Sequence, residues 1–128
     1  MHIDERTATV TVGAAAEQVG LTVHTLRWYE QEGLVSPVGR DSAGRRRYTA
    51  DDLGWLRLLT RLRRTGMPVR DMRRYADLAR QGEHTLAARR ELFEAHRDRV
   101  LARMAELEED LKVLNFKIEA YGAMERNG

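Results

Sequence analysis

The C-terminal third of the chain carries a heptad repeat, which restricts the possible folds more than any other feature. From about Thr85 to Met124 the pattern predicts one long helix. Its apolar a and d positions, spaced alternately three and four residues apart, are Met104, Leu107, Leu111, Leu114, Ile118 and Tyr121. Upstream, Val100 and Phe93 continue the d positions, whereas the a positions Arg97 and Arg90 are polar.

A helix of about 40 residues spans roughly 60 Å, longer than so small a body can cover. A sustained a/d stripe therefore predicts a partner helix, most simply a second copy of the chain. The alternative is a helix that folds back on its own monomer. The predicted homodimer interface consists of Phe93, Val100, Met104, Leu107, Leu111, Leu114, Ile118 and Tyr121.

Two short helices are predicted near the N-terminus. Thr11 is placed to cap a helix over Val12–Val19, and Thr22 to cap a second helix over Val23–Glu32. Gly33 suits the left-handed conformation that ends a helix. Helix, short glycine-containing turn and helix form the helix-turn-helix pattern.

The second of these helices carries an unusual set of polar and aromatic residues. Val23 and Leu26 supply one buried stripe, so several of the others face outward. Such a face suits contact with bases and phosphates. The alternative is an ordinary amphipathic helix with two core aromatics. The candidate DNA contacts here are Thr22, His24, Thr25, Arg27, Trp28 and Tyr29.

A β-hairpin is predicted next, with residues 41–44 at its tip, because GRDSAG is a turn cluster and RRRYT follows it. Side chains alternate along a strand, so Arg45 and Arg47 face one way and Arg46 and Tyr48 the other. Beside a recognition helix such a hairpin is a wing that grips the DNA backbone or minor groove. The alternative is a plain linker.

Two further helices follow the hairpin. Thr49 caps the first, over residues 50–65, and Asp52 completes a capping box. Pro68 starts the second, where its missing N–H costs nothing, and Gly82 ends it. The predicted fold class is mainly α. Its parts are a flexible leader (1–10), a winged helix-turn-helix head (11–49), two linker helices (50–82) and a long coiled-coil dimerisation helix (83–128).

Positive charge is concentrated in the middle of the chain. Residues 40–74 hold 11 Arg and 4 Asp, a net charge of +7, whereas the whole chain carries +2. Arginine presents a planar fork that suits phosphate and guanine edges. This cluster beside a candidate recognition helix favours double-stranded DNA as the partner. An Arg-rich codon bias explains the preference for Arg over Lys, but not the clustering.

Other classes of protein are disfavoured. With no cysteine there is no disulfide, zinc–thiolate site or thiol switch. The four histidines are scattered, and no phosphate loop or carboxylate pair stands out, so neither an enzyme nor a metal site or cofactor is expected. No stretch approaches the ~20 apolar residues of a membrane span, and we expect a cytoplasmic protein.

Three motifs resemble MerR-type transcriptional regulators: TVGAAAEQVGLTVHTLRWYEQEGL, GRRRYTADDL and RLRRTGMPVRDM. The resemblance covers nearly the whole chain. It implies a winged head, a linker helix pair, a long helix that pairs antiparallel with its partner, and a near-palindromic promoter site. It also implies action on RNA polymerase at that promoter. The remaining alternative is an architectural coiled-coil protein that binds DNA without sequence preference.

The resemblance also implies roles for single residues. Thr25, Arg27 and Tyr29 match recognition-helix positions that meet DNA, and His24 matches a position that is often basic. Arg46 and Tyr48 match wing positions that meet the backbone. The residue after the wing glycine is usually aromatic in the family, and here it is Arg45. A subgroup that senses aldehydes places a reactive cysteine where this chain has Arg61, so its thiol chemistry is not inherited.

Overall fold

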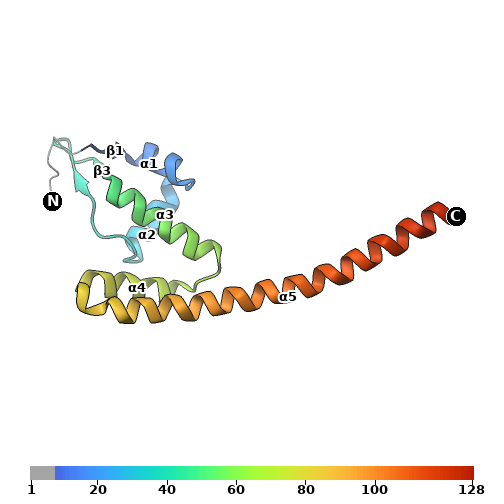
Figure 1. Ribbon diagram of the computed structural model, residues 1–128. Coiled ribbons are helices and arrows are strands. Elements are labelled where there is room, and N and C mark those ends of the chain that lie inside the picture. The colour runs from blue at the N-terminus through green and yellow to red at the C-terminus, as the bar shows by residue number, and fades with distance from the viewer. Residues whose placement is uncertain (1–7) are drawn as a thin grey trace. The chain divides into compact units, whose positions relative to one another are not determined.

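The computed structural model describes residues 8–128 (Figure 1). It divides into two units, one ending at Arg89 and the other spanning Arg90–Gly128. In chain order the elements are β1 (Val10–Thr11), α1 (Val12–Val19), α2 (Val23–Gln31), β2 (Gly39–Arg40), β3 (Arg46–Tyr48), α3 (Ala50–Arg64), α4 (Val69–Gln81), the 3-10 helix η1 (Glu83–Thr85) and α5 (Leu86–Asn127). The mainly helical fold class is confirmed.

Threonine caps set the starts of α1 and α2, as predicted. The Thr11 hydroxyl accepts a hydrogen bond from the backbone N–H of Ala14 at 3.2 Å. Thr22 accepts one from the N–H of Thr25 at 3.1 Å. α2 ends one residue before the predicted Glu32, which is its C-cap. Since a cap bonds to a residue only three positions away, the sequence pattern is sufficient to locate it.

The hairpin is also present, and a third strand joins it. β3 is central and pairs antiparallel with β2 on one side and β1 on the other. In this pairing Val10 of β1 lies opposite Tyr48 of β3. The expected flexible leader over residues 1–10 is therefore wrong at Val10, while residues 1–7 lie outside the described part of the chain. A two-residue strand leaves no pattern in the sequence, and its partner is far away along the chain.

Both helices of the pair begin at the expected signals, and α4 also ends at its expected glycine, whereas α3 ends at Arg64, one residue before the predicted end. Thr49 and Asp52 form the complete capping box. The backbone N–H of Thr49 donates to Asp52 Oδ2 at 2.8 Å, and the backbone N–H of Asp52 donates to the Thr49 hydroxyl at 3.2 Å. Pro68 is the N-cap of α4, and Gly82 is its C-cap with a φ of 101°. η1 was not predicted. The Thr85 hydroxyl donates to the Leu78 carbonyl at 2.6 Å, which joins this short turn to α4.

The core of the first unit lies between the helices and the small sheet. Its largest fully buried side chains include both aromatic and aliphatic residues: Leu26, Tyr29, Leu34, Tyr48, Leu56, Leu59, Met67 and Met72. The head and the helix pair both contribute to this set. A buried aliphatic side chain of this size contributes about 1.5–3 kcal/mol relative to an exposed one.

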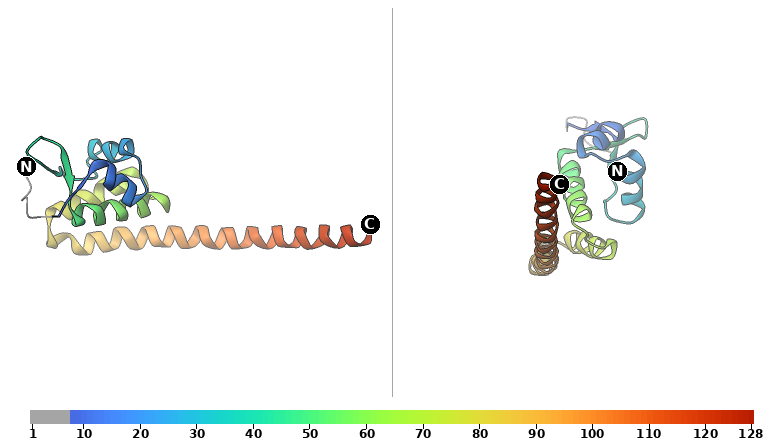
Figure 2. Two further views of the ribbon diagram at one scale, coloured as in Figure 1. Left: turned by 90° about the horizontal axis from the view of Figure 1, so that it is seen from above. Right: turned by 90° about the vertical axis from the view of Figure 1, so that its right-hand side faces the viewer.

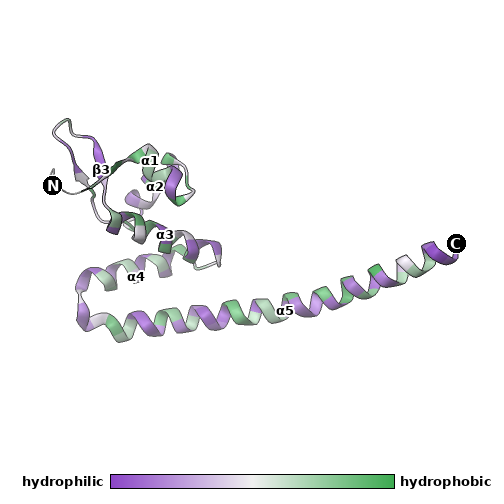
Figure 3. Ribbon diagram, turned by 45° about the horizontal axis from the view of Figure 1, so that its top comes forward, coloured by the Kyte–Doolittle hydropathy of each residue, from purple (hydrophilic) through white to green (hydrophobic). Residues whose placement is uncertain are grey.

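α5 is one unbroken helix (Figure 2). It starts at Leu86, one residue after the predicted start near Thr85, and ends at Asn127, beyond the predicted end near Met124. Apolar residues recur along its length to the C-terminal end (Figure 3). Among the described residues no helix has both the length and the apolar character needed to cross a membrane.

Candidate nucleic-acid interface

The two faces of α2 differ sharply in exposure. Leu26 and Tyr29, three residues apart, are buried at 1% and 2% exposure. His24 and Arg27 are exposed, and Thr25 is half-exposed. The buried pair orients the helix, so the polar side chains face away from the core. Arg27 thus presents its guanidinium outward, where it can reach a base edge or a phosphate.

The burial of Tyr29 corrects the expectation that its phenol lies on the DNA-facing surface. Leu26 and Tyr29, rather than Val23 and Leu26, form the most deeply buried pair of α2. Burial raises the pKa of Tyr29 above its ordinary value, and the charge of Arg63 partly opposes this rise. Tyr29 therefore packs in the core of the head, and it also lines the surface hollow beside α2.

A surface hollow of about 400 Å³ lies beside the outward face of α2. It is lined by Leu21, His24, Thr25, Trp28, Tyr29 and Arg63. The guanidinium carbon of Arg63 lies 5.8 Å from the centre of the Trp28 ring, within the range of a cation–π contact. Arg63 comes from α3, so sequence reasoning had no means of placing it beside α2. We add Arg63 to the candidate DNA contacts.

The Glu30 carboxylate of α2 bonds to two residues of the wing. Arg46 Nε lies 2.9 Å from Glu30 Oε2, and the Tyr48 hydroxyl donates to Glu30 Oε1 at 2.9 Å. Arg47, on the other face of the strand, donates from Nε to the hydroxyl of Thr9 at 3.1 Å. The predicted pairing of Arg46 and Tyr48 on one face agrees with these contacts. Glu30 was missed because its partners lie 16 and 18 residues further along the chain.

Tyr48 is 1% exposed, which corrects its expected place on the DNA-contacting surface of the wing. Burial raises the pKa of this phenol well above its ordinary value, and the hydrogen bond to Glu30 raises it further. Tyr48 therefore stays protonated and acts as a donor inside the protein. Its role is to hold the wing against α2.

Arg45 is highly exposed on the wing, with 79% of its side chain accessible. Its Nε lies 3.2 Å from Asp41 Oδ2 in the turn. The backbone N–H of Arg45 donates to the same carboxylate, and this bond is the main cause that lowers the pKa of Asp41. An exposed pair of this kind contributes little to stability, so Arg45 is available to a phosphate.

We therefore expect Arg45→Ala and Arg46→Ala to have different effects. Arg45→Ala should weaken specific and non-specific DNA binding alike and reduce the salt slope of log K by about one unit. Arg46→Ala should lower the thermal midpoint, because it removes a part-buried partner of Glu30 and releases the wing. Salt titrations measure the slope of log K, and thermal melts measure the midpoint. If Arg46→Ala leaves the midpoint unchanged and reduces the slope, Arg46 is a phosphate contact as first expected.

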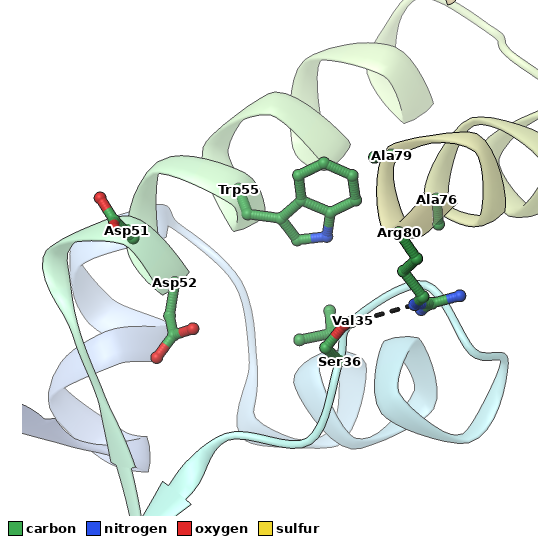
Figure 4. A pocket seen from close by; sticks show the side chains of 8 residues that line it. All are labelled: Val35, Ser36, Asp51, Asp52, Trp55, Ala76, Ala79 and Arg80. Carbon is green, nitrogen blue, oxygen red and sulfur yellow. Dashed lines mark hydrogen bonds between the residues drawn. The ribbon is translucent and has the colours of Figure 1, made fainter. Parts of the chain in front are cut away.

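A second hollow, of about 240 Å³, lies between the helix pair and the segment after α2 (Figure 4). Its lining combines apolar and charged residues: Val35, Ser36, Asp51, Asp52, Trp55, Ala76, Ala79 and Arg80. Trp55 comes from α3, and Ala76, Ala79 and Arg80 come from α4. In residues 8–128 no group of three or more His, Asp or Glu is arranged to hold a metal ion.

Comparison with known proteins gives consistent matches over this region. Residues 10–78 match the MerR HTH family of regulatory proteins, and residues 53–115 match the MerR DNA-binding family. A helix-turn-helix transcriptional regulator of Haemophilus influenzae is 42% identical over 113 residues, which cover 88% of this chain and 84% of that protein.

Solved structures give the same result. HiNmlR, described as a MerR family regulator that lacks the sensor domain and was crystallised bound to promoter DNA, is 42% identical with a TM-score of 0.82. The match covers 89% of this chain and 90% of that one. A MerR family transcriptional regulator from Bacillus thuringiensis is 28% identical with a TM-score of 0.78, covering 87% of this chain and 97% of that one.

Proposed function

Because the chain belongs to the MerR family of helix-turn-helix transcriptional regulators, we propose that two copies bind one promoter together, each with α2 in a major groove. The observation that most directly supports this placement in the groove is the orientation of α2. Its buried pair, Leu26 and Tyr29, leaves His24, Thr25 and Arg27 on the outer side. The promoter-DNA complex of HiNmlR supports this use of the same fold.

The charged groups around α2 suit the phosphates on either side of the groove. Arg45 stands on the wing, and Arg63 lies over Trp28 beside the helix. Contacts to phosphate set the register of a protein on the duplex, whereas contacts to base edges give sequence preference. In this proposal His24, Thr25 and Arg27 read bases, and the surrounding arginines position the head.

Dimerisation is proposed through α5. Its predicted a and d residues from Met104 to Tyr121 are each between 51% and 66% exposed in the single chain. Apolar surface in water costs about 25 cal/mol per Å², so a stripe this long favours a partner. The a/d spacing is that of a helix pair, and a second copy supplies the matching stripe. Val113 and Phe116, at 62% and 67% exposure, lie off this seam and were not predicted.

The proposed dimer determines how far apart the two DNA-binding heads lie. Two α5 helices of 42 residues set the distance between the heads, and therefore the spacing of the two half-sites. A near-palindromic operator matches the two-fold symmetry of such a dimer. By resemblance to the family, the bound dimer distorts the promoter so that RNA polymerase engages both of its elements. Such a regulator works in the cytoplasm, beside the chromosome and the polymerase.

The test is the ratio of affinities for two DNA duplexes. The first carries the sequence upstream of the protein's own gene, and the second carries the same bases in scrambled order. A regulator is expected to bind the first at least roughly 10³-fold more tightly at physiological salt. Equal affinities with a steep salt dependence would instead support an architectural protein that binds DNA without sequence preference.

A further inference from the structure

The segment that leaves α2 is bonded to the helix pair at three consecutive backbone carbonyls, those of residues 32–34. The carbonyl of residue 32 accepts from Arg73 Nε at 3.3 Å, and that of residue 33 accepts from Arg80 Nη2. The carbonyl of residue 34 accepts from the indole N–H of Trp55 at 2.7 Å. We call this arrangement of Trp55, Arg73, Arg80 and carbonyls 32–34 the carbonyl clamp.

The N–H groups of the same segment donate to carbonyls of α2. Leu34 N–H donates to the Tyr29 carbonyl at 2.9 Å, and Gly33 N–H donates to the Glu30 carbonyl at 3.1 Å. These two bonds form a Schellman motif, with Gly33 at a φ of 75°. The motif satisfies the donors but leaves the exit carbonyls facing outward from the helix end. The clamp supplies their partners from another part of the fold.

The clamp side chains are themselves held in place. Arg73 also forms an ion pair with the Glu32 carboxylate. Arg80 donates from Nη1 to Asp77 at 2.9 Å and from Nε to the Ser36 hydroxyl at 3.3 Å, the bond drawn in Figure 4.

Packing and charge add to these bonds. The Trp55 ring stacks on Tyr75, with ring centres 5.3 Å apart and an interplanar angle of 12°. The two guanidinium charges also lie at the negative end of the α2 dipole, where cations are favoured. The clamp therefore has a defined geometry.

We propose that Trp55, Arg73 and Arg80 are positioning residues for base reading: they hold the C-terminal end of α2 at a fixed orientation to α3 and α4. This inference rests on the proposed function, because it concerns the accuracy with which α2 enters the groove. Base contacts require side chains held close to their productive geometry, whereas attraction to phosphates does not. Loosening the clamp should therefore reduce specific binding and leave non-specific binding intact.

The test uses the full-length chain and three variants. Trp55→Phe removes the indole N–H but keeps an aromatic ring on Tyr75. Arg80→Met removes the donors and the charge while it keeps much of the aliphatic stem. Arg74→Met is the matched control, because Arg74 is an exposed arginine on the same helix. Affinities for the upstream and scrambled duplexes are measured over a salt series, at a temperature well below every melting midpoint.

Each clamp variant is expected to lower affinity for the upstream duplex by roughly threefold to tenfold, the range for the one hydrogen bond to an exit carbonyl that each variant removes. Affinity for the scrambled duplex should stay within twofold, and the salt slope should stay constant. The control should leave the ratio of the two affinities unchanged. An equal loss on both duplexes with a slope reduced by about one would make Arg80 a phosphate contact. An unchanged ratio with a lower melting midpoint would reduce the clamp to a stabilising role, and either result overturns the proposal.

Amide hydrogen exchange of the DNA-free protein separates failure of the clamp from failure of the proposed function. In both clamp variants, exchange at the Gly33 and Leu34 amides should be at least several-fold faster than in the parent. Exchange within α1 should not change. The parent could show no preference for its upstream duplex while exchange at these two amides is still faster in the clamp variants. In that case the proposed function fails, and the clamp only stabilises the end of α2. Unchanged exchange at these two amides would refute the clamp whatever the DNA measurements give.

Discussion

Replacing both Leu107 and Leu114 by Asp is expected to convert the proposed dimer into a monomer and to abolish tight binding to the operator. Both residues are d positions of α5, and in the single chain they are 59% and 57% exposed. In a dimer seam the substitutions would bury four carboxylates without partners, at an effective cost of several kcal/mol for each ion. Light scattering on the purified protein reports the mass, and circular dichroism reports the helix content.

Loss of the dimer should have a large effect on DNA binding. Two linked heads bind far more tightly than one, typically by about 10²–10⁴-fold, without any new contact. The matched control places Asp at Ala105 and Lys112, two exposed b positions of the same repeat, and should remain a dimer with normal affinity. A dimer that survives the Leu107 and Leu114 substitutions would place the interface elsewhere on the chain.

Arg27→Ala should weaken binding to the operator by about 1–3 kcal/mol, which is the cost of removing a bidentate contact to a base. Arg27 is exposed on α2, directly after the buried Leu26, so its removal leaves the core intact. The melting midpoint should therefore match that of the parent. Titration of the operator with the parent and the variant at one salt concentration measures the effect.

Arg27→Lys distinguishes base reading from simple attraction. Lysine keeps the charge but loses the planar fork, so it should restore non-specific binding more fully than specific binding. Gln31→Ala, an exposed substitution further along α2, serves as the control for changes in helix propensity. If Arg27→Ala binds the operator as tightly as the parent does, the placement of α2 in the groove is wrong.

Local signals in the sequence were sufficient for the helices and for the α5 repeat. Thr11, Thr22 and Thr49 each bond to a residue three positions away, so the side chain and its partner fall in one short window of sequence. The a and d residues of α5 belong to a single helix, whose periodicity does not depend on other parts of the fold. For the same reason the hairpin turn at residues 41–44 was predicted correctly.

Only the tertiary structure decided which side of α2 faces the core. Its aromatic and polar residues are spread around the helix, so the sequence alone left Tyr29 among the outward candidates. Contacts from distant segments hold the end of α2 in place. Tyr48 reaches Glu30 across 18 residues, and Trp55, Arg73 and Arg80 reach the exit carbonyls across 21, 41 and 47 residues. Periodicity within one helix carries no information on such pairs, because each depends on how the chain returns to pack against it.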